Sequence, residues 1–359
     1  MKKFRAALIG CGRIGFILEG DPLRNKPCTH FGGISRTSIK ITGACDINRE
    51  RLHHFADTAG LPADAAYTCH KKMLKEKKFD LITIATWTEN HSEIALDAID
   101  SGAKIIVLEK PVSHSLKSAR AIIEAADKKN CRIIINHERR YDYRYRKVGH
   151  IIDSGKIGEV KTVNARILTG PFRGESRINS GGGPLLHDGT HLVDIIRFYF
   201  GEVISVKGEF SRDSRDSGFE DTALAWMKTE SGVNIFLESG GGRKYFLFEL
   251  EIWGTEGKVL IGNGYEKLFI RNKSKLYKGF NDLEETKFPA MTKNSCFEEI
   301  YKEAELILKG KTDNIASDGA DGYRALEIIH GIYLSAHRKR EITLPLQKSG
   351  INLKKIFNL

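Results

Sequence analysis

The chain has 359 residues, 41% of them hydrophobic and 29% charged, and its 57 basic and 46 acidic residues give a net charge of +11. This length predicts two domains, and this composition excludes disordered, collagen-like and membrane-embedded proteins. The positive charge permits nucleic acid or an acidic small molecule as partner. We expect no nucleic acid, because the densest basic run, His70–Lys78, has no interleaved aromatic residues and is typical of a solvated helix face.

The chain carries no sign of export or of membrane insertion. Its first residues lead from a short apolar stretch straight into a glycine-rich turn, which predicts a first strand and not a signal peptide. The six cysteines are scattered and form no C-x-x-C pair, which favours a reducing cytoplasm over a disulfide framework. No apolar run approaches the roughly 20 residues of a membrane helix, so we expect no membrane partner.

The N-terminal part alternates between short apolar runs and amphipathic stretches. The expected strands are residues 4–9, 39–45, 81–85, 105–108 and 132–136. Helices are expected at residues 50–59, 91–101 and 116–129. This alternation, with strands apolar on both faces, predicts an α/β domain with a parallel sheet covered by helices.

The C-terminal part has consecutive strands with period-two alternation. They are expected at residues 159–168, 204–211, 222–228, 233–239, 245–253, 258–261 and 267–271, with late helices at 296–309 and 320–336. This order predicts an α+β domain with an open, mostly antiparallel sheet. We therefore divide the chain into a dinucleotide-binding domain 1–138, a second domain 139–340, and a closing strand and basic tail 341–359.

A dinucleotide motif directly follows the first strand. It reads Gly10-Cys11-Gly12-Arg13-Ile14-Gly15, which is G-x-G-x-x-G at the start of a βα unit. In this motif the first glycine allows a tight turn, the second lets backbone N–H groups approach a pyrophosphate, and the third lets a helix pack on the strand. The N-terminus of that helix would favour the phosphate charge. The alternative is a glycine-rich turn without a ligand.

The acidic residue expected after the second strand is Asp46, which predicts NAD in preference to NADP. A carboxylate here accepts from both ribose hydroxyls and repels a 2′-phosphate, although Arg49 lies close in sequence. Asp46 comes roughly ten residues later than the usual spacing of about 20. We attribute the excess to an inserted loop, residues 20–30. At its end, His30 either contacts substrate or is a solvent-exposed loop histidine.

Five segments together resemble the glucose-fructose oxidoreductase / inositol 2-dehydrogenase (Gfo/Idh/MocA) family over nearly the whole chain. They are the glycine motif, residues 82–111 ending in Glu109-Lys110-Pro111, Asn136–Asp142, Gly181–Asp194 and Ser317–Leu346. The resemblance implies a Rossmann domain and a second domain whose open sheet carries the substrate and often an oligomer interface. It implies hydride transfer between a nicotinamide and a sugar, a cyclitol or a related hydroxyl, in a homodimer or homotetramer.

The resemblance also assigns roles to individual residues. Lys110 is implied to be catalytic or substrate-orienting, and His191 to be the general acid/base. The cofactor site is expected to include Thr86, Trp87, His91, Glu109 and Lys110 as well as the glycine motif, Asp46 and Arg49. For His91 a structural role as a helix cap is the alternative.

Chemistry supports these assignments independently. Oxidation of an alcohol needs a base for the hydroxyl proton, and the pKa of histidine near 6.5 suits that exchange. A lysine cation stabilises developing alkoxide character, and Lys110 follows a strand at the sheet edge where ligands bind. The alternative for Lys110 is a solvated surface lysine.

The sequence departs from the family pattern in two places. His187 stands where many members have an aspartate, and Asp188 lies one residue later, about 100° away on a helix. His187 and His191 would share a helix face, so either is a candidate base. Their spacing also matches a metal pair, but no third ligand is evident and we expect no metal. Trp87 replaces the usual proline and either packs on the cofactor or belongs to the core.

Arginines cluster at two places. Arg139, Arg140, Arg144 and Arg146 lie at the domain junction, and Arg166, Arg173 and Arg177 precede the glycine run. Because guanidinium groups suit carboxylates and phosphates, we expect an anionic substrate bound by Arg139, Arg140 and Arg173 together with Asp188. The alternative is that most of these arginines form surface or interdomain ion pairs.

Three functions remain open from the sequence. The first is an NAD-dependent sugar or cyclitol dehydrogenase. The second is an enzyme that keeps NAD bound and recycles it, in oxidoreduction between two sugars or in redox-assisted glycoside cleavage. The third is a non-catalytic dinucleotide-sensing regulator, against which the presence of Lys110 and His191 argues.

Overall fold

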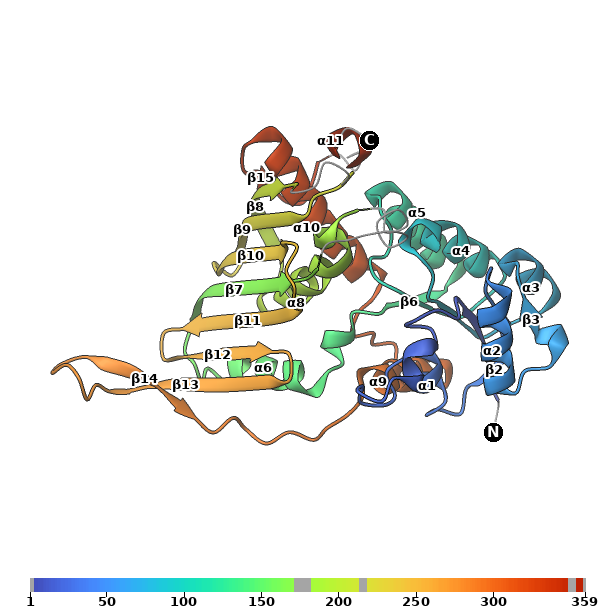
Figure 1. Cartoon of the computed structure of the whole chain (residues 1–359), viewed down its shortest axis with the longest axis horizontal. Helices are drawn as coiled ribbons and strands as arrows, with labels where there is room; N and C mark the ends of the chain where they lie inside the picture. The colour runs from blue at the N-terminus through green and yellow to red at the C-terminus, as the bar shows by residue number, and fades with distance from the viewer. Residues whose placement is uncertain (1–2, 171–181, 213–217, 348–352, 358–359) are drawn as a thin grey trace. The chain divides into compact units, whose positions relative to one another are not determined.

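The computed structural model describes residues 3–170, 182–212, 218–347 and 353–357 (Figure 1). The chain forms two compact units. The first combines Met1–Asp142 with Lys293–Tyr323, and the second combines Tyr143–Thr292 with Arg324–Leu359. The sequence-based division assigns residues 293–323 to the second domain. In the structure this segment returns to the first unit.

The first unit is built on a six-stranded sheet in the order β3-β2-β1-β4-β5-β6. All neighbouring strands are parallel, as their continuous apolar runs predict. The strands are β1 Arg5–Ile9, β2 Lys40–Cys45, β3 Ala66–Tyr67, β4 Leu81–Ile84, β5 Ile105–Leu108 and β6 Arg132–Ile135. Only β3, a two-residue edge strand, has no counterpart among the expected strands.

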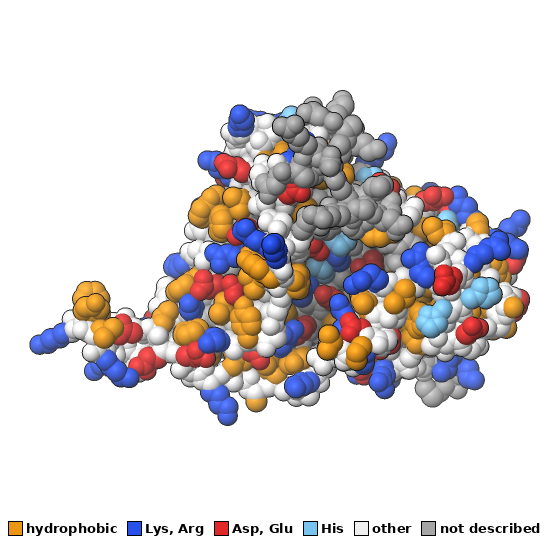
Figure 2. Space-filling view, viewed as in Figure 1, with side chains coloured by type: hydrophobic (Ala, Val, Ile, Leu, Met, Phe, Trp, Pro, Cys, Tyr) orange, Lys and Arg blue, Asp and Glu red, His pale blue; other side chains and the backbone are white. Residues whose placement is uncertain are grey.

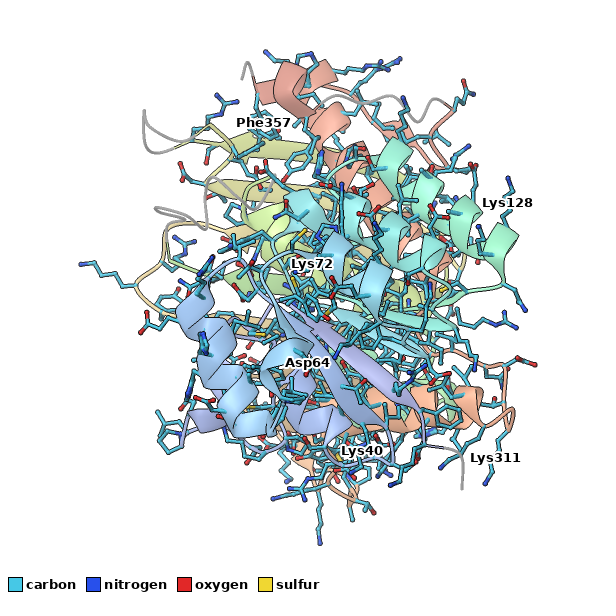
Figure 3. All side chains as sticks on the ribbon, turned by 90° about the vertical axis from the view of Figure 1, so that its right-hand side faces the viewer. Lys40, Asp64, Lys72, Lys128, Lys311 and Phe357 are labelled. Carbon is cyan, nitrogen blue, oxygen red and sulfur yellow. The ribbon has the colours of Figure 1, made fainter. Side chains whose placement is uncertain are left out.

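Several helices of this unit begin after a residue whose side chain caps the first turn. The helices are α1 His30–Ile34, α2 Arg49–Ala59, α3 His70–Glu76, α4 Thr88–Asp100, α5 Leu116–Lys129 and α9 Cys296–Leu308, with 3₁₀ turns η1 Ile17–Gly20, η2 Ala63–Ala65 and η3 Glu138–Arg140. The Asn48 side chain caps α2, and left-handed Gly60 ends it. The lysines of α3 are exposed, as on a solvated helix face, and Figure 3 labels Lys72 among them.

Helix α9 belongs to the first unit because its apolar stripe completes the core of the parallel sheet. Ile300, Tyr301 and Ala304 are buried in one cluster with residues of β1, β4 and β5. Contact with α1 is close, since a Cβ on Gly33 would lie 2.6 Å from the Phe297 carbonyl oxygen. Sequence periodicity predicts the helix but not the sheet on which it packs.

The glycine motif is followed by turns and not by the regular helix that we expected. The chain forms tight turns over residues 13–16 and then η1, and α1 begins only at His30. The inserted segment, residues 20–30, delays α1, because its two prolines and turn-forming polar residues interrupt a helix.

The second unit contains a nine-stranded sheet in the order β14-β13-β12-β11-β7-β10-β9-β8-β15. Only β7 and β10 pair in parallel, so the sheet is mostly antiparallel as expected. The strands are β7 Val160–Leu168, β8 Val203–Ser211, β9 Thr222–Thr229, β10 Asn234–Gly240, β11 Leu247–Gly254, β12 Gly257–Gly262, β13 Tyr265–Lys273, β14 Asn281–Thr286 and β15 Ile342–Thr343. The unpredicted strand β14 is polar and largely exposed, so it lacks a hydrophobic pattern.

The helical segments of this unit are α6 Tyr143–Asp153, the π-helical turn η4 Leu185–Gly189, α8 Thr190–Phe200, α10 Gly319–Arg338, which crosses the boundary between the units, and α11 Leu353–Phe357. The β13–β14 hairpin extends beyond its neighbouring strands (Figure 1). Exposed apolar residues Leu276, Tyr277 and Phe280 lie at its tip (Figure 2). No helix in the described part of the chain has the length and apolar character needed to cross a membrane.

Candidate active site

The glycine motif forms an open backbone cradle at the end of β1. Gly10 has a φ of +97°, and a Cβ there would lie 2.4 Å from the Ala85 carbonyl oxygen. A Cβ on Gly15 would lie 2.1 Å from the Gly10 carbonyl oxygen, whereas one on Gly12 would meet nothing within 4 Å. Gly10 and Gly15 are thus required by close backbone packing. The open space at Gly12 fits a diphosphate that approaches the backbone.

Asp46 lies at the carboxyl end of β2 and is tied to this cradle. Its carboxylate accepts from the backbone N–H of Cys11 at 2.8 Å and from that of Asn48 at 2.8 Å. The guanidinium of Arg51 lies 3.6 Å from the same carboxylate. Arg51 was not singled out from the sequence. Arg13 and Arg49 are exposed, while Ile14 is partly buried.

Glu109 lies at the centre of a buried polar network at the end of β5. Its Oε1 is 2.9 Å from His30 Nε2 and accepts from the Asn136 side chain. His30 Nδ1 lies 2.7 Å from the Tyr301 hydroxyl, which contacts Thr83 Oγ1 at 2.8 Å. The histidine tautomer with hydrogen on Nε2 satisfies both ring contacts, because it donates to Glu109 and accepts from Tyr301.

This network keeps Glu109 ionised next to Lys110. Burial alone would raise the pKa of Glu109, but the contact with His30, the charge of Lys110 and the bond from Asn136 outweigh it and lower the pKa to about 2. The second carboxylate oxygen accepts from the Lys110 backbone N–H at 3.2 Å. The network thus anchors Lys110 through its backbone. Because His30 is fully buried, the alternative of a solvent-exposed loop histidine is wrong.

His91 is a buried link between two backbone segments beside Lys110. Its ring nitrogens lie 2.9 Å from the Pro111 carbonyl oxygen and 3.0 Å from that of Thr86. Burial lowers the pKa of His91, and both of its ring nitrogens face backbone carbonyl oxygens. It therefore does not cap the N–H groups of α4, as the structural alternative supposed. Trp87 is 37% exposed, which argues against the core alternative for this residue.

The second unit presents its candidate residues on one turn-and-helix segment. His187 and Asp188 lie in η4, and His191 lies in the first turn of α8. His187 Nδ1 is 2.9 Å from Asp188 Oδ1, and both side chains are partly exposed. The side chains of these two neighbouring residues are in contact although the helical rotation was expected to turn Asp188 away. His191 is buried.

A carboxylate that sequence reasoning missed lies beneath this segment. Glu220 is buried, and its Oε1 accepts from the Leu185 N–H at 2.9 Å and from the Tyr333 hydroxyl at 2.8 Å. Burial raises the pKa of Glu220 to about 7, and the charge of nearby Asp221 acts in the same direction, since the two donors do not outweigh desolvation. No local signal marks Glu220, because it reads as an acidic residue before a strand.

Two of the arginines at the domain junction form ion pairs. Arg140 is buried, and its guanidinium binds both carboxylate oxygens of Asp321, at 2.8 and 3.1 Å, and the Ala316 carbonyl. Arg139 lies 3.1 Å from its neighbour Glu138. These contacts favour the ion-pair alternative for both residues. Arg173 and Arg177 lie outside the described residues.

Comparison with known proteins gives two matches to family profiles. Residues 4–137 match the profile described as an oxidoreductase family with an NAD-binding Rossmann fold, and residues 145–260 match the GFO/IDH/MocA C-terminal domain. The chain is 25% identical over 359 residues to a D-apiose dehydrogenase of Paraburkholderia graminis, which covers 96% of this chain and 90% of that protein. It is 28% identical over 237 residues to an inositol 2-dehydrogenase of Salmonella paratyphi B, covering 65% of this chain and 66% of that protein.

Among solved structures, the fold is similar to the WlbA dehydrogenase from Bordetella pertussis, described in complex with NADH and UDP-GlcNAcA. The TM-score is 0.76 at 21% sequence identity, and the match covers 96% of this chain and 100% of that one.

Proposed function

The chain belongs to the GFO/IDH/MocA family of NAD-binding oxidoreductases, and on this premise we propose that it transfers a hydride between NAD and a secondary hydroxyl or ketone of a sugar-like substrate. One observation carries the proposal. The carboxyl ends of parallel strands β1 and β5 present the open cradle at Gly12 and the anchored Lys110 at one sheet edge. Ligands bind at this edge of open parallel sheets.

Residues of the first unit bind the cofactor and stabilise the reacting oxygen. Gly10, Gly12 and Gly15 hold the cofactor diphosphate, and Asp46 takes the adenosine ribose, which favours NAD over NADP. Bound NAD supplies the hydride acceptor. The Lys110 ammonium stabilises the developing alkoxide, and Glu109 holds the Lys110 backbone in place.

The proton of the substrate hydroxyl passes to a histidine of the second unit. His191 is the base that the family resemblance assigns. His187, bonded to Asp188, is the second candidate, since that carboxylate orients the ring.

The substrate belongs to the sugars, sugar acids, nucleotide sugars or cyclitols. The names of the relatives, which act on apiose and inositol, support this class. An anionic substrate remains a proposal. Because Arg139 and Arg140 are paired with carboxylates, they do not favour an anionic substrate over a neutral sugar.

The test is NADH formation at 340 nm with a panel of neutral sugars, sugar acids, nucleotide sugars and cyclitols, each with NAD and with NADP. We expect turnover with one class and a preference for NAD. No turnover, with NAD released from the denatured protein by mass spectrometry, would favour a recycling enzyme. No turnover and no bound NAD would contradict the proposal. The expected dimer or tetramer stays a prediction, which light scattering of the purified chain tests.

A further inference from the structure

The segment that carries His187 and Asp188 rests on the buried Glu220 carboxylate. Glu220 lies just before β9, and its Oε1 takes two hydrogen bonds. One comes from the Leu185 N–H, the first backbone donor of η4, and the other from the hydroxyl of Tyr333 on α10. A side chain distant in sequence therefore satisfies an N-terminal donor of the π-helical turn, where the turn itself offers no acceptor.

Two glycines let the backbone before η4 pack closely on Glu220 and on the strand ends beside it. A Cβ on Gly183 would lie 2.3 Å from the Glu220 carboxyl carbon. At Gly240, where φ is +84°, a Cβ would lie 2.2 Å from the Asp221 carbonyl oxygen and 2.9 Å from Pro184. The backbone before η4 thus packs directly on the carboxylate and on the strand ends beside it, without room for another side chain.

Tyr333 is itself held in place from the opposite side. Its ring is fully buried and meets the ring of Phe357 edge-on, with centroids 5.1 Å apart. Phe357, which Figure 3 labels on α11, also packs against Phe219, the neighbour of Glu220. The hydroxyl of Tyr333 is therefore directed at the carboxylate by packing as well as by its hydrogen bond.

We propose that Glu220 is a positioning residue for hydride transfer, which holds η4 so that His187, Asp188 and the following His191 face the substrate. The inference rests on the proposed function and deepens it. Glu220 does not touch substrate. It acts through Leu185, two residues before His187, and through the packing of Gly183.

An acceptor oxygen is the feature of Glu220 that this role requires. Removing it leaves the Leu185 N–H and the Tyr333 hydroxyl buried without an acceptor, and a buried unpaired donor is costly. The negative charge is not required, because a protonated carboxyl or an amide still offers Oε1. The raised pKa of Glu220 agrees with this, since the site tolerates the neutral form.

The experiment compares Glu220→Met with Glu220→Gln, which differ in the acceptor but little in size. We expect Glu220→Met to lower kcat between about 10-fold and 100-fold, the effect of misplacing a catalytic group by about 1 Å. In Glu220→Gln we expect kcat to stay close to the wild-type value. The Kd for NADH should be unchanged in both variants. Tyr333→Phe, a milder change, should lower kcat by a smaller factor.

Glu327→Gln is the matched control, since Glu327 is a buried carboxylate of the same unit whose described partners are Arg324 and Leu346.

Amide hydrogen exchange gives a readout that needs no turnover. We expect the peptide spanning Leu185 to His191 to exchange faster in Glu220→Met and in Tyr333→Phe than in the wild type, Glu220→Gln or Glu327→Gln. Unchanged exchange in Glu220→Met would overturn the inference, as would faster exchange with wild-type kcat. Should Glu220→Met fail to fold, Tyr333→Phe decides in the same way. A wild-type protein without turnover on any sugar would overturn the proposed function instead.

Discussion

Two buried glutamates, one in each unit, lie beside the two groups of candidate catalytic residues and have opposite electrostatic surroundings. Glu109 is bonded by His30 and Asn136 and lies beside the charge of Lys110, and its pKa falls to about 2. Glu220 accepts from the Leu185 N–H and the Tyr333 hydroxyl and has no cation among its described partners, and burial raises its pKa to about 7. The same side chain therefore serves as a fixed charge in one unit and as a neutralisable acceptor in the other.

This difference follows from what each glutamate supports. Glu109 adjoins a lysine that must stay charged to stabilise an alkoxide, so a permanent anion beside it is useful. Glu220 supports a backbone turn, and a turn needs an acceptor rather than a charge. Substitutions in the two units should separate these roles.

The largest expected effect is that of Lys110→Ala on the charged side of the comparison. Loss of the ammonium should lower kcat about 10³-fold, the range for a group that stabilises developing charge. The Kd for NADH, measured by fluorescence titration, should change little. Lys104→Ala is the control, because Lys104 is an exposed lysine paired with Asp80. Wild-type kcat in Lys110→Ala would remove Lys110 from the mechanism.

The next effect separates the two histidines of the second unit. His191→Ala should lower kcat between about 10²-fold and 10³-fold, the contribution of a general base, while His187→Ala should cost less. NADH binding should survive in both variants. If His187→Ala has the larger effect, the base is the His187–Asp188 pair and the assignment from the family resemblance is wrong.

The stability of the protein should fall with rising pH because of Glu220. Its pKa is raised from 4.5 to about 7 on folding, so the native state binds the proton more tightly than the unfolded chain. This contribution is fully present below pH 4.5 and is lost as the pH rises through 7. Relative to Glu220→Gln, which does not titrate, the wild type should lose up to about 3 kcal/mol between about pH 5 and pH 8. Urea unfolding at both pH values measures this, and parallel curves would contradict it.

The contribution of Glu109 to the free energy of unfolding should instead increase with pH. Its pKa is lowered from 4.5 to about 2 on folding, so its contribution is present above pH 4.5 and is lost as the pH falls from there towards 2. At pH 7 Glu109→Gln should unfold with a free energy about 1–3 kcal/mol below the wild type, and the gap should narrow below about pH 4.5. If the difference in the free energy of unfolding between the wild type and Glu109→Gln did not change with pH, Glu109 would not be held as an anion.

The smallest effect concerns the cofactor. Asp46→Asn keeps an acceptor for the Cys11 N–H but removes the charge that repels a 2′-phosphate. The ratio of kcat/KM for NAD to that for NADP should fall about tenfold, or about 1.4 kcal/mol. Asp64→Asn, at an exposed aspartate paired with Lys77, is the control. An unchanged ratio would mean that Asp46 does not contact the ribose.

The sequence predicted features that depend on local pattern and missed those that depend on distant contacts. The parallel sheet, the mostly antiparallel sheet and the cradle at Gly12 follow from apolar runs and glycine spacing. The assignment of α9 to the first unit could not be predicted, because periodicity shows an apolar stripe but not its partner. Tyr301 and Glu220 carry no motif, and their contacts join segments far apart in the chain. Neither the π-helical turn nor the contact of His187 with Asp188 was predicted.

The most direct test of the central claim follows the hydrogen itself. The best substrate of the sugar panel, deuterated at its reacting carbinol carbon, is oxidised by the wild-type protein, and the NADH formed is weighed by mass spectrometry. We expect the nicotinamide to gain one deuterium in each turnover, and the labelled substrate to be oxidised more slowly than the unlabelled one. NADH without deuterium would show that the hydride does not come from the carbinol, and would contradict the proposed reaction.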